Sequence, residues 1–176
     1  MIELELEKTY LAKFLPADLK NSSNKIVKDI YIPKSIKHPV LRIRQKGEKY
    51  EITKKEPVNE NDSSEQHEHT INLTKEEFQT LEKVSGKNVL KIRYFYDYQG
   101  QPAEVDIFQD DLIGLVLIDF EFKSVVEKDN FKMPDFCLTE VTQDPHFAGG
   151  MLCGKKYTDI EPHLSGLGYK KLNINL

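Results

Sequence analysis

Apolar and polar residues alternate along most of the chain, which is typical of strands with one face in a core and the other in a polar environment. The pattern is clear from Ile2 to Tyr10 and recurs after it. Short turns that contain Gly47 and Gly100 each favour a hairpin between neighbouring antiparallel strands. The alternation predicts about eight strands, at residues 2–10, 25–32, 40–45, 49–55, 66–73, 89–97, 103–108 and 115–123.

Helix signals are fewer. Thr74 and Glu77 have the spacing of a capping box and predict a helix that runs to about Lys83. Thr158 predicts the cap of a second helix near the C-terminal end. The polar segment 57–64 predicts a mobile loop. Because no linker divides the chain, we expect one mainly β (α+β) domain over residues 1–176, with helices as flanking supports.

Composition limits the expected partners. The 176 residues are 39% hydrophobic and 31% charged, enough to bury one core. A net charge of −4 argues against broad binding to nucleic acids or anionic membranes, so we expect a small-molecule partner. No apolar run could cross a bilayer, no secretory segment is recognised, and Cys137 and Cys153 lack metal-ligand spacing. These features favour a cytoplasmic location.

Basic side chains alternate with apolar ones on several predicted strands. Arg42 and Arg44 share one strand face, and Lys91 and Arg93 repeat the same spacing. On the strand at 49–55, apolar side chains on the opposite face would leave Lys55 beside the arginines and Lys54 pointing outward. If the strands close into a barrel with this face inward, arginine forks and lysine point charges together suit a chain of phosphates.

Acidic side chains repeat with the same period on three other strands. The pairs are Glu5 with Glu7, Glu104 with Asp106, and Asp119 with Glu121. Crowded carboxylates repel each other unless cations intervene, and hard oxygen ligands select Mg²⁺ or Mn²⁺. A solvated strand face is the usual explanation for one such pair. Recurrence on so many strands instead favours a charged barrel interior.

Several motifs follow one another along the chain. They are Glu5-Leu6-Glu7-Lys8-Thr9, Leu41-Arg42-Ile43-Arg44, Tyr50-Glu51-Ile52-Thr53-Lys54-Lys55, Lys91-Ile92-Arg93-Tyr94, Val105-Asp106-Ile107-Phe108, Gly114-Leu115-Val116-Leu117, Asp119-Phe120-Glu121, and Glu140-Val141-Thr142 with Asp144. In this order the chain resembles the CYTH domains, also called triphosphate tunnel metalloenzymes. The resemblance covers nearly the whole chain and is far more specific than the opening motif alone.

The resemblance implies an eight-stranded antiparallel β-barrel, or triphosphate tunnel, with flanking helices. It implies metal-dependent hydrolysis of inorganic triphosphate or a small organic triphosphate with Mg²⁺ or Mn²⁺. The implied phosphate-binding residues are Arg42, Arg44, Lys55, Lys91 and Arg93. The implied metal-binding residues are Glu5, Glu7, Glu68, Asp119 and Glu121, while Asp106 would orient one of the cations. A homodimer is compatible with the sequence, and no nucleic-acid or membrane partner is expected.

The chain also departs from the family pattern. The lysine of the opening motif falls on Thr9, and Lys8 lies on the opposite strand face unless a bulge turns it inward. In hydrolytic members that lysine helps a tyrosine activate water, and Tyr31 is the implied counterpart of this tyrosine. Tyr31 and Lys8 are therefore the expected catalytic residues. In the segment from Ser64 to Ile71, Ser64 and Gln66 stand where the family carries charged side chains.

These departures keep two alternatives open, a catalytically weak polyphosphate- or nucleotide-binding module of the same fold and a class IV-type adenylyl cyclase.

Two histidines and two glycines have structural explanations that need no further functional site. His67 and His69 share a strand face that would point outward if Glu68 points inward. Gly149 and Gly150 lack the spacing of a dinucleotide-binding loop and predict turns.

Overall fold

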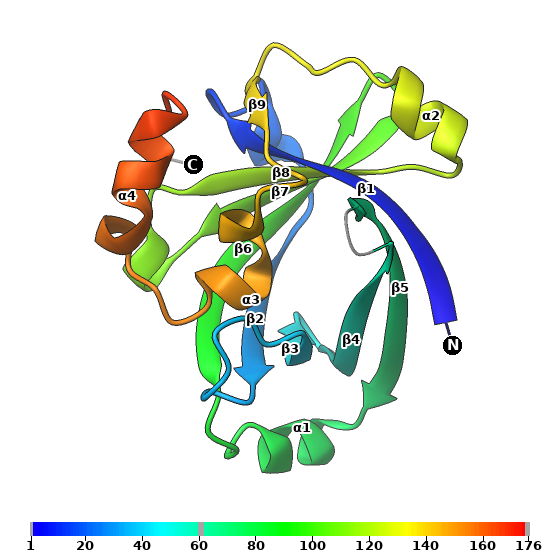
Figure 1. Ribbon diagram of the computed structural model, residues 1–176, viewed down its shortest axis with the longest axis vertical. Helices are drawn as coiled ribbons and strands as arrows, with labels where there is room; N and C mark the ends of the chain where they lie inside the picture. The colour runs from blue at the N-terminus through cyan, green and yellow to red at the C-terminus, as the bar shows by residue number, and fades with distance from the viewer. Residues whose placement is uncertain (1, 60–61, 175–176) are drawn as a thin grey trace.

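A computed structural model describes residues 2–59 and 62–174 of the chain. Within these ranges nine strands form one antiparallel sheet. They are β1 (Ile2–Ala12), β2 (Asn24–Ile32), β3 (Leu41–Lys46), β4 (Lys49–Asn59), β5 (Asp62–Leu73), β6 (Lys87–Tyr98), β7 (Gln101–Phe108), β8 (Val116–Glu121) and β9 (Cys137–Glu140). Their order is β5-β4-β3-β2-β6-β7-β8-β1-β9, and β5 also pairs with β1. This last pairing closes β1 to β8 into a barrel (Figure 1).

The eight predicted strands and the barrel are confirmed. The short strand β9, which pairs with the end of β1 outside the barrel cycle, was not predicted, because four residues are too few to show alternation. The predicted loop at 57–64 is wrong for the described part of that segment. Strand β4 continues to Asn59 and β5 begins at Asp62, while positions 60–61 lie outside the described residues. The turns at Gly47 and Gly100 are confirmed, and both glycines have positive φ.

Helices flank the barrel. They are α1 (Lys75–Leu81), α2 (Val125–Asn130), α3 (Gly149–Leu152) and α4 (Tyr157–Gly166), with short 3₁₀ helices η1 (Leu19–Asn21), η2 (Asp110–Leu112) and η3 (Pro145–Phe147). The capping box is confirmed, because Thr74 and Glu77 each accept the other's backbone N–H. The predicted cap at Thr158 is wrong. Helix α4 begins at Tyr157, one residue before Thr158, so Lys156 holds the N-cap position. The Lys156 N–H donates to Asp159 Oδ2 at 2.8 Å.

The apolar core lies mainly outside the barrel. One cluster joins the outer faces of β1, β7 and β8 to the aromatic residues Phe122, Phe131 and Phe136. A second cluster packs Phe78 of α1 against Ile30 and Ile43. The third closes one end of the barrel, and its members are Leu11, Tyr31, Val89, Phe108, Leu112, Leu115, Leu117, Val141, Phe147, Leu152, Cys153, Tyr157, Ile160, Leu164 and Tyr169. Because these clusters bury the apolar faces, the barrel interior can remain polar.

No helix within the described residues is long and apolar enough to cross a membrane.

Candidate functional site: the charged tunnel

One large cavity runs through the barrel, and side chains from all eight barrel strands line its wall. Of the thirteen site residues implied by the sequence, the structure brings twelve onto this wall. They are Glu5, Glu7, Tyr31, Arg42, Arg44, Lys55, Glu68, Lys91, Arg93, Asp106, Asp119 and Glu121. The alternation of each strand places them there, because the residues between them point outward, either into the apolar clusters or to the exposed outer face.

Arg44 is held by a buried carboxylate that the sequence analysis did not identify. Its Nε and Nη2 atoms donate to the two carboxylate oxygens of Asp29 at 2.6 and 2.8 Å. Burial alone would raise the pKa of Asp29, yet the Arg44 guanidinium holds that pKa well below its usual range. Asp29 lies directly opposite Arg44 in the β2–β3 register, so strand pairing is the signal that reveals it.

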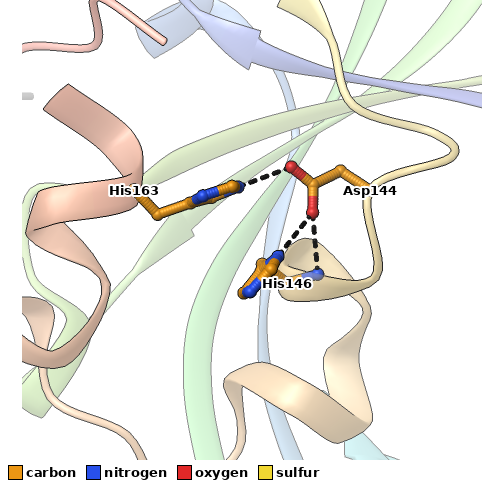
Figure 2. Close-up of side chains that lie close together, drawn as sticks. All are labelled: Asp144, His146 and His163. Atoms are coloured by element: carbon orange, nitrogen blue, oxygen red, sulfur yellow. Dashed lines mark hydrogen bonds and ion pairs between the residues drawn. The ribbon is translucent and has the colours of Figure 1, made fainter. Parts of the chain in front are cut away.

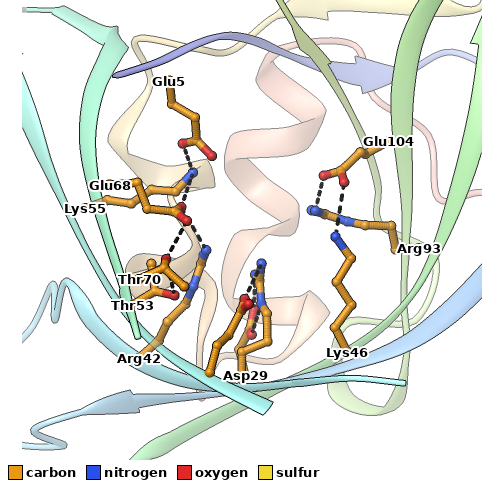
Figure 3. Close-up of polar contacts among 12 residues, drawn as sticks. Glu5, Asp29, Arg42, Lys46, Thr53, Lys55, Glu68, Thr70, Arg93 and Glu104 are labelled. Carbon is orange, nitrogen blue, oxygen red and sulfur yellow. Dashed lines mark hydrogen bonds and ion pairs between the residues drawn. The ribbon is translucent and has the colours of Figure 1, made fainter. Parts of the chain in front are cut away.

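Asp106 holds two further cations on the β6 side of the tunnel. It accepts two hydrogen bonds from Arg93, from Nε and Nη2 at 2.6 Å each, and one from the Lys91 ammonium group. Although burial opposes it, this pairing keeps the pKa of Asp106 well below its usual range. Arg93 also pairs with Glu104, whose carboxylate lies 3.5 Å from Lys46 Nζ (Figure 3). These three basic side chains are thus fixed in place before any ligand arrives.

Lys55 and Arg42 lie beside carboxylates of β1 and β5, and only Arg42 keeps an unpaired donor among the described residues. Lys55 Nζ pairs with Glu5 and lies 3.5 Å from Glu68 and 3.6 Å from Glu7 (Figure 3). Arg42 Nη2 is 3.7 Å from Glu68, and Nη1 donates to the Tyr31 hydroxyl at 3.3 Å. The Nε atom of Arg42 is buried and has no hydrogen-bond partner among the described residues. A buried unpaired donor is costly, so this position suits an anionic ligand.

An acidic cluster occupies the β1 and β8 side of the wall. Burial, together with the nearby Asp119, Glu5 and Glu121, raises the pKa of Glu7 to about 7 even though Lys55 opposes the shift. Burial also raises the pKa of Asp119, with Asp106 adding to the effect, and it raises the pKa of Glu121, with Glu104 adding. These carboxylates lack enough positive neighbours. Their hard oxygen donors fit a divalent cation such as Mg²⁺ or Mn²⁺.

Lys8 is the one implied site residue that is not on the wall. Its Nζ lies 3.7 Å from Glu140 Oε2 and away from the tunnel. The β1–β8 register runs from Glu7 to Leu11 without a shift, so no bulge turns Lys8 inward. Lys8 therefore keeps the outward position that alternation predicts, and the inward alternative is not realised. Thr9 takes the wall position, and its hydroxyl donates to Asp119 Oδ1 at 2.7 Å.

The β5 strand carries fewer charges inward, as the sequence indicated. Gln66 Nε2 donates to Glu7 Oε1 at 3.3 Å, and Glu68 is held by Thr70 as well as by the basic residues. Ser64 is buried and accepts a hydrogen bond of 2.7 Å from Lys128 Nζ of α2, a contact that the sequence analysis missed. Both neighbouring histidines, 67 and 69, are exposed on the outer face, as predicted.

Two glycines allow α3 to approach the apolar end of the tunnel. A Cβ on Gly149 would lie 2.1 Å from the Tyr31 hydroxyl, and a Cβ on Gly150 would lie 2.1 Å from the Pro39 carbonyl oxygen. Both glycines line the cavity. The predicted turns are wrong at these positions, because the two residues begin α3. Close approach, rather than turn geometry, explains why they are glycines.

The closed eight-stranded antiparallel barrel with its charged interior has the architecture that the resemblance to the triphosphate tunnel class implies. Two crystal structures of the inorganic triphosphatase NE1496, one described as a hypothetical protein, match with a TM-score of 0.63 and 26% identity. The match covers 86% of this chain and 95% or 99% of theirs. A candidate adenylate cyclase from Bacillus halodurans matches with a TM-score of 0.53 and 14% identity over 99% of this chain and 95% of its own, which shows the fold alone.

A relative that matches by sequence is also named as an inorganic triphosphatase. The inorganic triphosphatase of Acetivibrio thermocellus is 34% identical over 82 residues, which are 46% of this chain and 51% of the relative. The chain thus matches about half the length of that relative. No protein-family model matches the chain. The solved structures and this relative together confirm the resemblance to the CYTH domains.

Proposed function

We propose that the protein is a metal-dependent triphosphatase that hydrolyses inorganic triphosphate or a small organic triphosphate in the tunnel. The observation that carries the proposal is the division of the wall by charge. Basic side chains project from β3, β4 and β6, and the acidic cluster projects from β1 and β8, with β5 between β4 and β1 and β7 between β6 and β8. The inorganic triphosphatases among the similar proteins support the proposal of triphosphate hydrolysis.

The overall charge of the wall supports a requirement for metal. Ten carboxylates and six lysine or arginine side chains from the described residues line the cavity, an excess of four carboxylates. Such a wall would repel a triphosphate, which is itself an anion, unless additional cations enter with it. Glu5, Glu7, Asp119, Glu121 and Glu68 would hold Mg²⁺ or Mn²⁺, consistent with their hard oxygen donors. A bound ion would neutralise phosphate charge near the reacting phosphorus.

The basic side chains would position the substrate. Arg42, which has an unpaired Nε among the described residues, and Lys55 would contact phosphate oxygens directly. Arg44, Lys91 and Arg93 would supply a prearranged positive field from their pairs with Asp29 and Asp106. These roles agree with the hydrogen bonds and ion pairs that each basic side chain makes in the tunnel. Preorganised cations stabilise the charge that develops when the bond between phosphorus and the bridging oxygen breaks.

The attacking water must lose a proton as its oxygen bonds to phosphorus. The Tyr31 oxygen lies in the cavity and accepts a hydrogen bond from Arg42, whose positive charge would favour the phenolate. In that form Tyr31 is the candidate base: the phenolate oxygen would take the proton of the attacking water and become a hydroxyl. Lys8, placed beside Glu140, would take no part. The absence of a lysine at the Thr9 position favours slow turnover near neutral pH.

That same substitution supports a second candidate, a phosphate-binding module of low catalytic power. Phosphate release from inorganic triphosphate, ATP and thiamine triphosphate, each with Mg²⁺ and with Mn²⁺, separates the two functions. We expect release from at least one substrate and no cyclic nucleotide from ATP. Triphosphate binding by calorimetry without release from any substrate would support the binding module. Cyclic AMP as the main ATP product would contradict both.

A further inference from the structure

A second polar cluster lies outside the barrel, where the segment that follows β9 meets α4. It consists of Asp144, which caps η3, His146 within η3, and His163 within α4 (Figure 2). None of the functions proposed for the tunnel uses the two histidines. They share a surface groove with residues 140–145 and are not part of the tunnel wall.

Both imidazoles direct a nitrogen at the same carboxylate. His146 Nδ1 lies 2.8 Å from Asp144 Oδ1, and His163 Nε2 lies 2.6 Å from Asp144 Oδ2. The two rings face each other with centroids 4.1 Å apart and planes tilted by 31°. One potential donor atom from each of the three residues lies within 4.8 Å of the others. The three donors therefore converge on one point in space (Figure 2).

Two imidazoles and one carboxylate form a recognised donor set for Zn²⁺ and related transition ions, with the remaining positions open to water. Tetrahedral coordination at ordinary Zn–N and Zn–O lengths separates donors by about 3.3 Å. The present histidine–aspartate separations of 2.6 and 2.8 Å would open by about 0.5 to 0.7 Å. The three donors, now within 4.8 Å of one another, would draw together around the ion. The side chains have room to move, because His146 is 49% and His163 is 37% exposed.

We propose that Asp144, His146 and His163 form a binding site for a Zn²⁺-class ion at the edge of the tunnel, where Asp144 lines the cavity and the two histidines lie outside it. The acidic cluster in the tunnel offers carboxylate oxygens and favours Mg²⁺ or Mn²⁺, whereas imidazole nitrogen favours softer ions. The two sites would discriminate between metals by donor chemistry.

The ion would fasten α4 to a segment of the tunnel wall. Val141 donates its N–H to the Thr9 carbonyl at 2.8 Å, and Thr142 Oγ1 accepts the Thr9 N–H at 3.0 Å. Val141, Thr142 and Asp144 all line the cavity. A metal bridge from Asp144 to His163 would thus join α4 to the strand that carries the acidic cluster, and Zn²⁺ should stabilise the folded protein.

Calorimetric titration of the metal-stripped protein with ZnCl₂, in excess Mg²⁺ to occupy the tunnel, tests the proposal. We expect one Zn²⁺ equivalent per chain and an increase in melting temperature. His146→Asn and His163→Gln should each weaken Zn²⁺ binding by more than about 100-fold, since each removes a direct ligand. The double variant His67→Gln/His69→Gln is the matched control, because it removes two exposed histidines elsewhere, and it should bind like wild type.

Histidine ring resonances in the NMR spectrum of the wild type provide a test that does not depend on variants. Zn²⁺ should shift the resonances of His146 and His163 and leave those of His67 and His69 in place. Wild type that binds no Zn²⁺, or binding that survives in both His146→Asn and His163→Gln, would overturn the proposal. Shifts confined to His67 and His69 would overturn it as well. None of these results depends on catalysis in the tunnel.

Discussion

Thr9 donates a hydrogen bond to Asp119 across the β1–β8 pair, with Oγ1 and Oδ1 2.7 Å apart. A neutral hydroxyl therefore occupies the wall position where related tunnels carry an ammonium group. Thr9→Lys should place a cation beside Asp119 and assist deprotonation of the attacking water. Because general acid–base catalysis contributes about 10²- to 10⁴-fold, phosphate release at neutral pH should rise at least about tenfold.

Lys8→Ala is the control for this substitution. Lys8 points to Glu140 outside the tunnel, so its removal should leave the turnover of triphosphate unchanged. Large loss of activity in Lys8→Ala, with no gain in Thr9→Lys, would instead show that Lys8 reaches the substrate in solution.

Two adjacent lysines on β4 provide a matched test of triphosphate binding. Lys55 faces the tunnel and Lys54 is exposed beside Glu56 on the outer face. Triphosphate with Mg²⁺ should raise the melting temperature of wild type and of Lys54→Ala, because a ligand of the folded state stabilises it. The rise should disappear in Lys55→Ala. Equal shifts in the two variants, measured by differential scanning fluorimetry, would show that the anion binds elsewhere.

Arg44 should matter for stability as well as for the ligand. Arg44→Met leaves the Asp29 carboxylate buried and unpaired, since Asp29 is 1% exposed. Breaking a buried pair in this way typically costs about 3–5 kcal/mol in the free energy of unfolding. Urea denaturation followed by circular dichroism measures this loss. Arg44→Met/Asp29→Leu should recover most of it, and a fully stable Arg44→Met would refute the structural role.

The acidic cluster predicts that the metal-free protein is less stable at neutral than at acidic pH. The pKa of Glu7 is about 7 in the folded state and 4.5 ordinarily. The folded protein therefore holds a proton that the unfolded chain releases between these values. This contribution is complete below pH 4.5 and lost as the pH rises through 7, a change of about 3 kcal/mol. Asp119 and Glu121 shift in the same direction.

Thermal denaturation in a chelator at pH 5 and at pH 7.5 measures this effect. Wild type should melt at the lower temperature at pH 7.5, and Glu7→Gln should reduce the difference. Mg²⁺ should stabilise the protein more at pH 7.5 than at pH 5, since metal and proton compete for the same carboxylates. A stability of wild type that rises from pH 5 to pH 7.5 in the chelator would contradict the assignment.

Much of the tunnel wall could be predicted from the sequence, because alternation decides which side chains share a strand face. Tyr50 and Ile52 place Lys55 inward and Lys54 outward, and the structure confirms this arrangement. The same rule places Lys8 outward unless a bulge intervenes, and the regular β1–β8 register contains no such bulge. The side-chain period of a strand depends only on residues that are close in the sequence, so a single sequence is enough to predict which side chains share a face.

Contacts between distant elements could not be predicted in this way. Asp29 meets Arg44 only through the register of β2 and β3. His163 meets Asp144 because α4 returns to the segment after β9, and Lys128 reaches Ser64 from a helix 64 residues away. Tertiary packing determines these contacts, and no local pattern records them. The glycines of α3 likewise reflect the approach of Tyr31 and Pro39 rather than a turn.

The most direct test of the tunnel as a triphosphatase is phosphate release from inorganic triphosphate, compared in Mg²⁺, in Mn²⁺ and in a chelator. We expect release with at least one metal and none in the chelator. Arg42→Ala and Glu7→Gln should each reduce the rate at least about 100-fold, because one removes a cation aimed at phosphate and the other a metal ligand. Release that continues equally in the chelator, or that is unchanged in both variants, would contradict the proposed function.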